Sequence, residues 1–411
     1  MGQFKVSNKR IIDIAFWIFV FTSTISDHTI IGNLGYLVFI GITGLQIINK
    51  KKLPFPAYIA LEFLFIAFCA FHIYFGYAVN KSVAINRLRT LILCFVFDWC
   101  LYYVALQYKD WKALAKSYVS AVLLGLLLTL FLNFQEIVNG RFGSNDTSGI
   151  SLLGVNIANL NATMIGYISM ICIFFVSLLY DNRTDRKKMV IYDVLFIMFI
   201  ILSSTRKVLI AIPIIIIFSR YFREKSNRLL KLGKYLVFII ITVYVGYYSI
   251  MHIPLLYRTV GSRIQTLFIY LSEGSVVESS LRSRLRLESL AQASFAAKPW
   301  MGWGLDNFKY TLNNGGYYAH SNYYEIVVSV GIIGGVFYYI KYIYSIIHCV
   351  KVIKISTSEN ASIIKTFLLF MLIAIVLEYW QVTYFYRLMM LPYVLANAIC
   401  TISYRERVYS K

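Results

Sequence analysis

The sequence predicts an all-α, polytopic membrane protein with about twelve transmembrane helices and one large extracytoplasmic loop. Hydrophobic residues make up 59% of its 411 residues, and charged residues make up 14%. Soluble domains carry roughly 25% charged residues. The mean hydropathy is +0.67. Apolar stretches of about 20 residues, which is the length that crosses a bilayer, recur along most of the chain.

Polar and charged segments separate these stretches and set approximate limits for each span. Lys50, Lys51 and Lys52 end the second, and Pro54 and Pro56 precede the third. We expect one membrane domain with helices in residues 1–253, an external loop in 254–322 that contains short amphipathic helices, and further helices and a tail in 323–411. The expected spans are 11–26, 30–48, 57–79, 90–106, 114–134, 156–180, 190–202, 208–222, 235–251, 323–349, 363–380 and 388–403.

The net charge of +21 arises from 40 Lys and Arg against 19 Asp and Glu. Most basic residues fall in short loops that alternate along the chain, as the positive-inside rule requires, so the charge does not indicate nucleic-acid binding. The pattern predicts that both termini are cytoplasmic and that residues 254–320 lie outside. One expected external loop disagrees, because it carries Lys81, Arg87 and Arg89. Either the span limits differ there, or the arginines face a water-filled site.

The large loop contains a predicted amphipathic helix over residues 280–297 with several arginines. Arg282 and Arg286 lie four residues apart on one face, while Arg284 lies on another. Such arginines can extend to lipid phosphates from an interfacial helix. Alternatively, at least one binds the diphosphate of a substrate, because guanidinium makes bidentate contacts with phosphate oxygens.

Two further residues are candidates for chemistry. Arg206 follows Ser203, Ser204 and Thr205 in a polar turn between two short spans, where an arginine facing the bundle interior is a candidate functional residue. His320 lies between a glycine-rich segment and the tenth span. Near neutral pH it could act as general base on the hydroxyl of an acceptor sugar. No paired carboxylate motif occurs outside the spans, so we expect no metal and no cofactor.

The order of these features resembles the O-antigen ligase/polymerase superfamily of membrane glycosyltransferases. The resemblance is carried by Arg284, by Pro299-Trp300-Met301-Gly302-Trp303-Gly304, by His320-Ser321-Asn322, and by Gly331. Ser204-Thr205-Arg206 matches a further family feature, and Gly154-Val155-Asn156 is a loose match that lacks the family's proline. The resemblance covers residues 200–335.

This resemblance implies a glycosyl transfer from undecaprenyl-diphosphate-linked donors to acceptors on the outer face of the cytoplasmic membrane. Catalysis would rest on His320, Arg284 and Arg206, and Arg282, Arg286 and Asn322 would bind substrate. Trp303 and Tyr318 suit stacking on sugars, and they equally suit an interfacial aromatic belt.

Our first expectation is a polymerase of capsule, exopolysaccharide or O-antigen repeat units. En bloc ligation to a final acceptor and transport of lipid-linked oligosaccharide are the alternatives. The expected partners are the lipid-linked donor and acceptor, membrane lipid, and a flippase and chain-length regulator of the same pathway.

Overall fold

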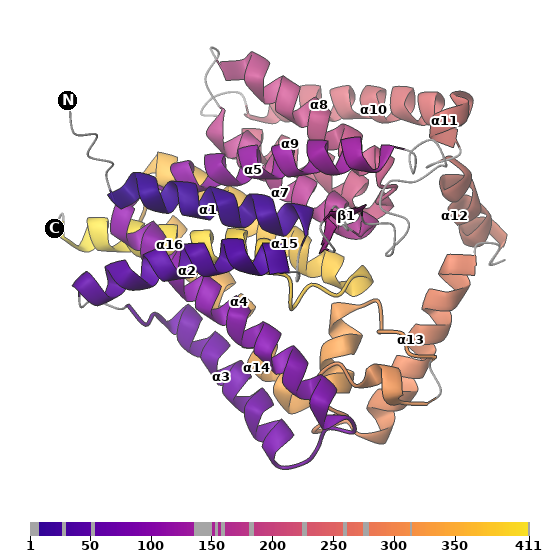
Figure 1. Ribbon diagram of the computed structural model, residues 1–411. Coiled ribbons are helices and arrows are strands. Elements are labelled where there is room, and N and C mark those ends of the chain that lie inside the picture. The colour runs from indigo at the N-terminus through magenta and orange to yellow at the C-terminus, as the bar shows by residue number, and fades with distance from the viewer. Residues whose placement is uncertain are drawn as a thin grey trace.

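The computed structural model describes residues 8–26, 30–50, 54–134, 150–152, 155–157, 161–180, 185–223, 228–257, 261–273, 279–312 and 315–409. In these parts the chain forms a helical bundle (Figure 1). Seven of the described helices are long and apolar enough to cross a membrane, which indicates a multi-pass membrane protein. A helix occupies each of the twelve expected spans. Whether all twelve cross the membrane stays a prediction.

Contacts between helices run through the whole bundle. Helix α1 packs against α2 and α5, while α7 packs against α5, α8 and α9. Helix α14 packs against α3, α16 packs against α4 and α7, and α15 packs against α9, α14 and α16. The bounds are α1 Asn8–Ile25, α2 Ile30–Lys50, α3 Ala57–Tyr74, α4 Lys81–Tyr108, α5 Trp111–Leu132, α7 Ala162–Leu179, α8 Arg186–Leu202, α9 Arg206–Arg223, α10 Arg228–His252, α14 Asn322–Ile353, α15 Ser358–Leu377 and α16 Arg387–Tyr409.

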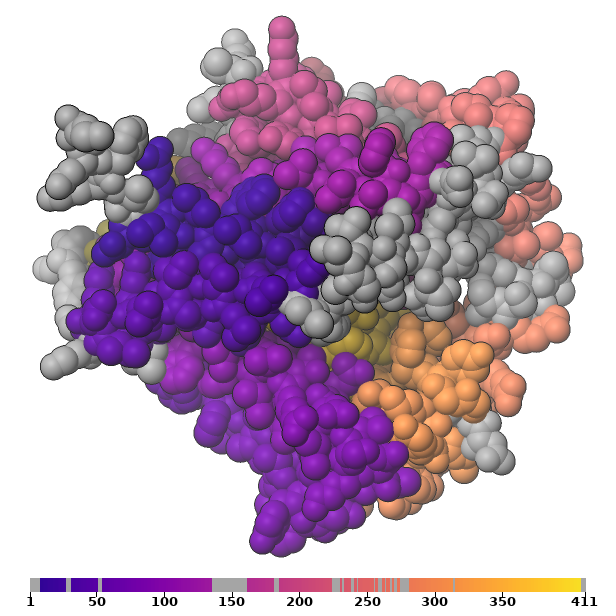
Figure 2. Space-filling view, in the orientation of Figure 1, coloured from indigo at the N-terminus to yellow at the C-terminus, as the bar shows by residue number. Residues whose placement is uncertain are grey.

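The segment between α10 and α14 is largely helical too. It contains α11 (Pro254–Leu256), α12 (Ser262–Glu273), α13 (Ser279–Ala297) and the short 3-10 helix η3 (Phe308–Tyr310). Helix α13 coincides with the predicted amphipathic helix, and its apolar side packs against α14. In Figure 2, the orange surface of the chain after α13 borders the violet surface of α3 and α4.

Two ion pairs bring basic segments together at one end of the bundle. Lys9 of α1 pairs with Asp110 before α5, and Lys109 pairs with Glu406 of α16 at 3.4 Å. Arg87 lies on α4 about 30 Å from Lys109, given the helical rise of about 1.5 Å per residue. Arg87 and its neighbours are therefore at the opposite end of the bundle from three of the segments that we expect to be cytoplasmic.

Helix α4 begins earlier than the sequence predicted. Asn80 caps it, because its side-chain oxygen accepts the N–H of Val83 at 3.3 Å. The helix thus starts at Lys81, and Arg87 lies on its first turns rather than in a loop. The helix therefore extends before the expected span of residues 90–106, because the Asn80 cap initiates it at Lys81.

The expected sixth span also starts in a different place. Val155–Ile157 forms a short antiparallel pair with Ile150–Leu152, so the fold is not purely helical. Helix α7 begins only at Ala162, where Asn161 accepts the N–H of Thr163 at 2.8 Å and acts as the N-cap. The local cap, rather than the hydropathy, decides the start of this helix.

A break in α14 joins the bundle to the segment after α13. Gly331 has φ 67° and ψ −173° within the helix. In an unbroken helix the N–H groups of Ile332 and Ile333 would donate to the carbonyls of Val328 and Ser329. Instead, Ile332 donates to Pro299 at 2.8 Å and Ile333 donates to Trp300 at 3.4 Å.

The break also leaves the carbonyls of Val328 and Ser329 without partners in the helix, and the turn at residues 299–304 supplies them. Val328 accepts the N–H of Trp303 at 2.9 Å, and Ser329 accepts the N–H of Gly304 at 2.7 Å. This exchange requires very close backbone approach. A Cβ at Gly331 would lie 2.0 Å from the carbonyl oxygen of Trp300, and one at Gly302 would lie 2.6 Å from that of Val328. The glycines of the sequence motif are therefore explained by packing.

We predict that Gly331→Ala destabilises the protein by about 1–3 kcal/mol, because its backbone conformation is nearly exclusive to glycine and the new methyl group meets Trp300. The midpoint of thermal unfolding in detergent measures the effect. Gly335→Ala is the matched control, since its Cβ would meet Val327 at an ordinary 3.5 Å. Equal midpoints for the two variants would contradict this role of Gly331.

Candidate functional site

A cavity of about 310 Å³ lies where α4, α7, α13 and α14 converge with the loop after α15. Its volume is at the lower end of the range for small-molecule sites, roughly 300–1,000 Å³. Most of its lining side chains are charged, polar or aromatic. They are Arg87, Asn161, Thr163, Met164, Arg284, Asp306, Tyr318, His320, Glu325, Trp380, Gln381, Val382, Phe385 and Tyr386.

Helix α13 supplies Arg284 to this cavity. The helix is held by Leu287 and Ala291, which are buried in one small cluster with Phe308 and Val328. Arg284 lies on an exposed part of the same helix and borders the cavity. An apolar face thus anchors α13 against α14, while the guanidinium remains accessible from the cavity.

His320 lies in a tight turn just before α14. Its φ of 56° is in the left-handed region, which is uncommon for residues other than glycine and is typical of functional turns. Its ring lies against that of Tyr318 in a tilted arrangement, with 4.1 Å between the ring centroids and 45° between the ring planes. Burial, then Arg284 and then Lys207, lower the pKa of His320 to about 4. The imidazole is therefore neutral at physiological pH.

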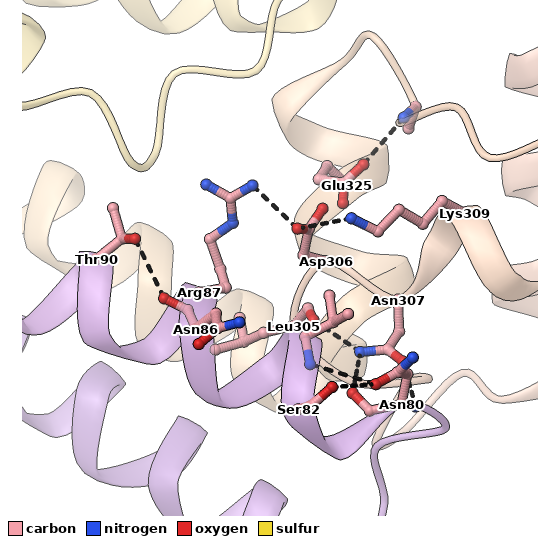
Figure 3. Close-up of polar contacts among 12 residues, drawn as sticks. Asn80, Ser82, Asn86, Arg87, Thr90, Leu305, Asp306, Asn307, Lys309 and Glu325 are labelled. Atoms are coloured by element: carbon pink, nitrogen blue, oxygen red, sulfur yellow. Dashed lines mark hydrogen bonds and ion pairs between the residues drawn. The ribbon is translucent and has the colours of Figure 1, made fainter. Parts of the chain in front are cut away.

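Arg87 occupies another side of the cavity (Figure 3). Its guanidinium donates to Asp306 at 3.0 Å and lies over the ring of Phe385, 3.7 Å from the centroid. Lys309 contacts the same carboxylate oxygen of Asp306 at 3.1 Å. Asn307 secures this segment to the start of α4, because its side chain accepts the N–H of Asn80 and donates to the Asn80 carbonyl.

Glu325 adds a second carboxylate on this side, next to Asp306 in Figure 3. It is on the first turn of α14 and is only 2% exposed. One of its oxygens accepts the N–H of Ala319 at 2.9 Å. Since Ala319 directly precedes His320, this bond ties the carboxylate to the turn that carries the histidine.

The loop after α15 forms a further wall and is clamped by Asn322. The side-chain oxygen of Asn322 accepts the N–H groups of Thr383 and Tyr384, each at 3.1 Å. Its side-chain nitrogen donates to Glu378 of η4 (Glu378–Trp380) at 2.9 Å. Its backbone N–H donates to Gln381 at 3.0 Å. The side-chain oxygen of Gln381 is buried and has no hydrogen-bond partner among the described residues, and Gln381 lines the cavity.

The structure brings three of the sequence-predicted residues together at the cavity, namely Arg284, His320 and Tyr318. Five others are not among its lining residues. Arg282 and Arg286 are exposed on α13, and Asn322 is buried beneath the loop that it clamps. The remaining two are Arg206 and Trp303.

Local contacts account for these last two positions. The indole N–H of Trp303 donates to the carbonyl of Ser294 at 2.7 Å, and its ring lies under Lys298. Arg206 begins α9, and the turn before it docks on α7 through Thr205, which donates to the carbonyl of Ala162 at 3.1 Å. The neighbouring Lys207 acts on His320 electrostatically and donates to the carbonyl of Trp380, a cavity residue, at 2.6 Å.

Arg87, Asp306, Glu325 and Gln381 were not among the site residues predicted from the sequence, although Arg87 was one of the arginines that could face a water-filled site. A signal for Arg87 was present, because it stood in a basic segment on the side where the charge pattern expected few cations. Asp306 and Glu325 were visible only as isolated acids of the large loop and of the helix after it. Their proximity depends on the docking of residues 299–304 on α14.

Among the residues that the structure describes, no group of three or more histidine, cysteine or acidic side chains is arranged to hold a metal ion. The arrangement instead combines cations, a neutral imidazole, carboxylates and aromatic rings. Cations can bind and stabilise a phosphate leaving group, while the imidazole and carboxylates can contact hydroxyl groups.

Comparison with known proteins agrees with this geometry. Residues 191–339 match the family model described as O-antigen ligase, and no curated protein matches the chain. The matched segment contains Arg284, Asp306, Tyr318, His320 and Glu325 of the cavity. Members of this family are membrane glycosyltransferase-like ligases and polymerases. The match over this segment supports the O-antigen ligase/polymerase superfamily.

Proposed function

We propose that this protein polymerises undecaprenyl-diphosphate-linked oligosaccharide repeat units into a capsular, exopolysaccharide or O-antigen chain. The observation that carries the proposal is the shared cavity, in which Arg284 and His320 meet although they are 36 residues apart in the chain. The donor and the acceptor would both be lipid-linked and would enter at the outer face of the cytoplasmic membrane. Both termini would be cytoplasmic.

In the proposed reaction, Arg284 binds the diphosphate of the donor and stabilises it as the leaving group. Lys207 lies on the same side and donates to the carbonyl of Trp380, while burial, then Arg284, lower its pKa well below the usual range. The neutral ring of His320 contacts the acceptor hydroxyl and orients it towards the anomeric carbon of the donor. Tyr318, Phe385 and Tyr386 offer aromatic faces on which sugar rings can stack, and Gln381 offers an oxygen that can accept from a hydroxyl.

En bloc ligation to a final acceptor is the second candidate, because the matching family model is described as O-antigen ligase. Both reactions use the same donor chemistry and differ in the acceptor. A test uses purified protein in lipid nanodiscs with lipid-linked repeat units isolated from the bacterium that makes it. A ladder of products on a gel supports polymerisation, and a single transfer to an added final acceptor supports ligation.

We predict that Arg284→Ala and His320→Ala each lower glycosyl transfer by about 10²–10⁴-fold, because one removes leaving-group stabilisation and the other removes the group that contacts the acceptor. The rate of product formation in nanodiscs measures this loss. Arg89→Ala is the control, since Arg89 is exposed on α4 and does not line the cavity. Normal product lengths from both cavity variants would refute a glycosyltransferase site and favour transport.

We also predict that His320 titrates near pH 4 in the free protein. A lowered pKa means that the neutral ring persists as the pH falls from 8 to about 5 and is protonated only near pH 4. Nitrogen NMR of histidine-labelled protein follows the ring, with His320→Asn used for assignment. Arg284→Ala should raise the midpoint towards the ordinary value by removing a nearby cation, whereas Arg286→Ala should not. A midpoint near 6.5 in the unaltered protein would contradict the burial and charge seen here.

A further inference from the structure

We infer that the carboxylate of Glu325 takes the proton from the acceptor hydroxyl, while His320 orients that hydroxyl. This inference rests on the proposed glycosyl transfer and assigns a further catalytic residue to it. It follows from the distribution of charge around the cavity. Arg284 and Lys207 act together on His320, whereas Glu325 lies beside Asp306 and Arg87.

The histidine is poorly placed to hold a proton. Protonation of His320 would place a positive charge beside Arg284 in a partly buried site, where burial and Arg284 already lower the pKa of Lys207. A general base works best when its pKa is near the working pH, and a value of about 4 is far below it. Protonation of Glu325 has the opposite effect, because it removes a buried negative charge instead of creating a positive one.

Of the two carboxylates on this side, Glu325 is the better candidate. Asp306 already binds Arg87 and Lys309 through one oxygen, so a proton there would weaken two ion pairs that hold the cavity wall. Glu325 accepts a backbone N–H from Ala319 through one oxygen. Glu325 lines the cavity, and that bond holds its carboxylate in a fixed orientation.

The hydrogen bond from the Ala319 N–H to Glu325 also links the carboxylate of Glu325 to the turn of His320. It joins Glu325 to the residue directly before His320, in the turn where His320 has a positive φ. The imidazole and the carboxylate therefore border the cavity from one rigid unit at the start of α14. An acceptor hydroxyl in the cavity can donate its hydrogen bond to Glu325 while its oxygen is oriented by His320.

The proposed step transfers the donor glycosyl group from the diphosphate to the acceptor oxygen. The acceptor oxygen forms a bond with the anomeric carbon of the donor sugar, and the bond from that carbon to the diphosphate oxygen breaks with its electron pair. The lipid diphosphate leaves as an anion that Arg284 stabilises. The hydroxyl proton moves to Glu325, which returns it to water after the product departs.

The test compares Glu325→Gln with Glu288→Gln. The glutamine amide oxygen can still accept the Ala319 N–H, so the first variant removes the proton acceptor and keeps the turn. Glu288 is a carboxylate of α13 that accepts from Tyr324 and does not line the cavity. With radiolabelled lipid-linked repeat units, we expect single-turnover transfer to fall at least about 100-fold in Glu325→Gln, with donor binding unchanged. The Glu288→Gln variant should transfer normally.

A second variant covers the case in which Glu325→Gln also loses donor binding. Glu325→Ala leaves space in the cavity, and added formate should restore part of the transfer if a carboxylate is needed as proton acceptor. Rescue by formate supports the inference, and its failure overturns it, as does normal transfer by Glu325→Gln. If the unaltered protein transfers nothing, the proposed function fails together with this inference. If it transfers and Glu325→Gln transfers equally well, only this inference fails.

Discussion

The exchange of backbone hydrogen bonds around Gly331 is the interaction on which the candidate site depends. A helix that crosses a membrane must satisfy its backbone groups internally, and a break in it exposes two donors and two acceptors. Here the turn at residues 299–304 satisfies all four. Because that turn is fixed to α14, the residues after it reach α4, where Asp306 meets Arg87. The break thus places a polar segment where an unbroken helix would have offered none.

The first turn of α14 also holds two neighbouring segments in place, the loop after α15 and the turn of His320. Asn322 uses its side-chain oxygen and nitrogen to hold the loop after α15, and that loop supplies five of the cavity residues. Glu325 holds the turn of His320 from one side while Asn322 holds the loop from another. The first turn of α14 therefore orients the histidine, a carboxylate and the aromatic wall together. This order is present before substrate binds, so binding costs less conformational entropy in the site residues.

The two sides of this cavity differ in charge. Burial and the charge of Arg284 keep the ring of His320 neutral, and the positive charge of Arg284 suits the binding of a phosphate. Across the cavity, Arg87 is paired with Asp306, so its charge is offset and the pair presents both donors and acceptors. This difference in charge suits a reaction in which a diphosphate leaves on the side of Arg284 and a hydroxyl loses its proton on the side of Asp306 and Arg87.

Much of the local structure was predictable from the sequence, because hydropathy reports on lipid burial directly. The positions of the helices follow from apolar stretches, and the amphipathic period of residues 280–297 predicted α13. The order of motifs from Arg284 to Gly331 was enough to predict the superfamily, and the family match confirms that prediction. The start of α7 was misplaced because a side-chain cap at Asn161, rather than hydropathy, ends the preceding segment.

The tertiary structure alone decided which polar residues meet. Lys207, which the sequence did not single out, lowers the pKa of His320 and donates to the carbonyl of Trp380 beside the cavity. Arg87 looked like an exception to a charge rule, and its pairing with a residue 219 positions away could not be read from the chain. The sequence by itself thus determined a helical membrane protein of this superfamily and named Arg284 and His320. The shared cavity and its carboxylate side required packing between segments far apart, because close contacts between distant residues depend on the fold and leave no local periodic pattern.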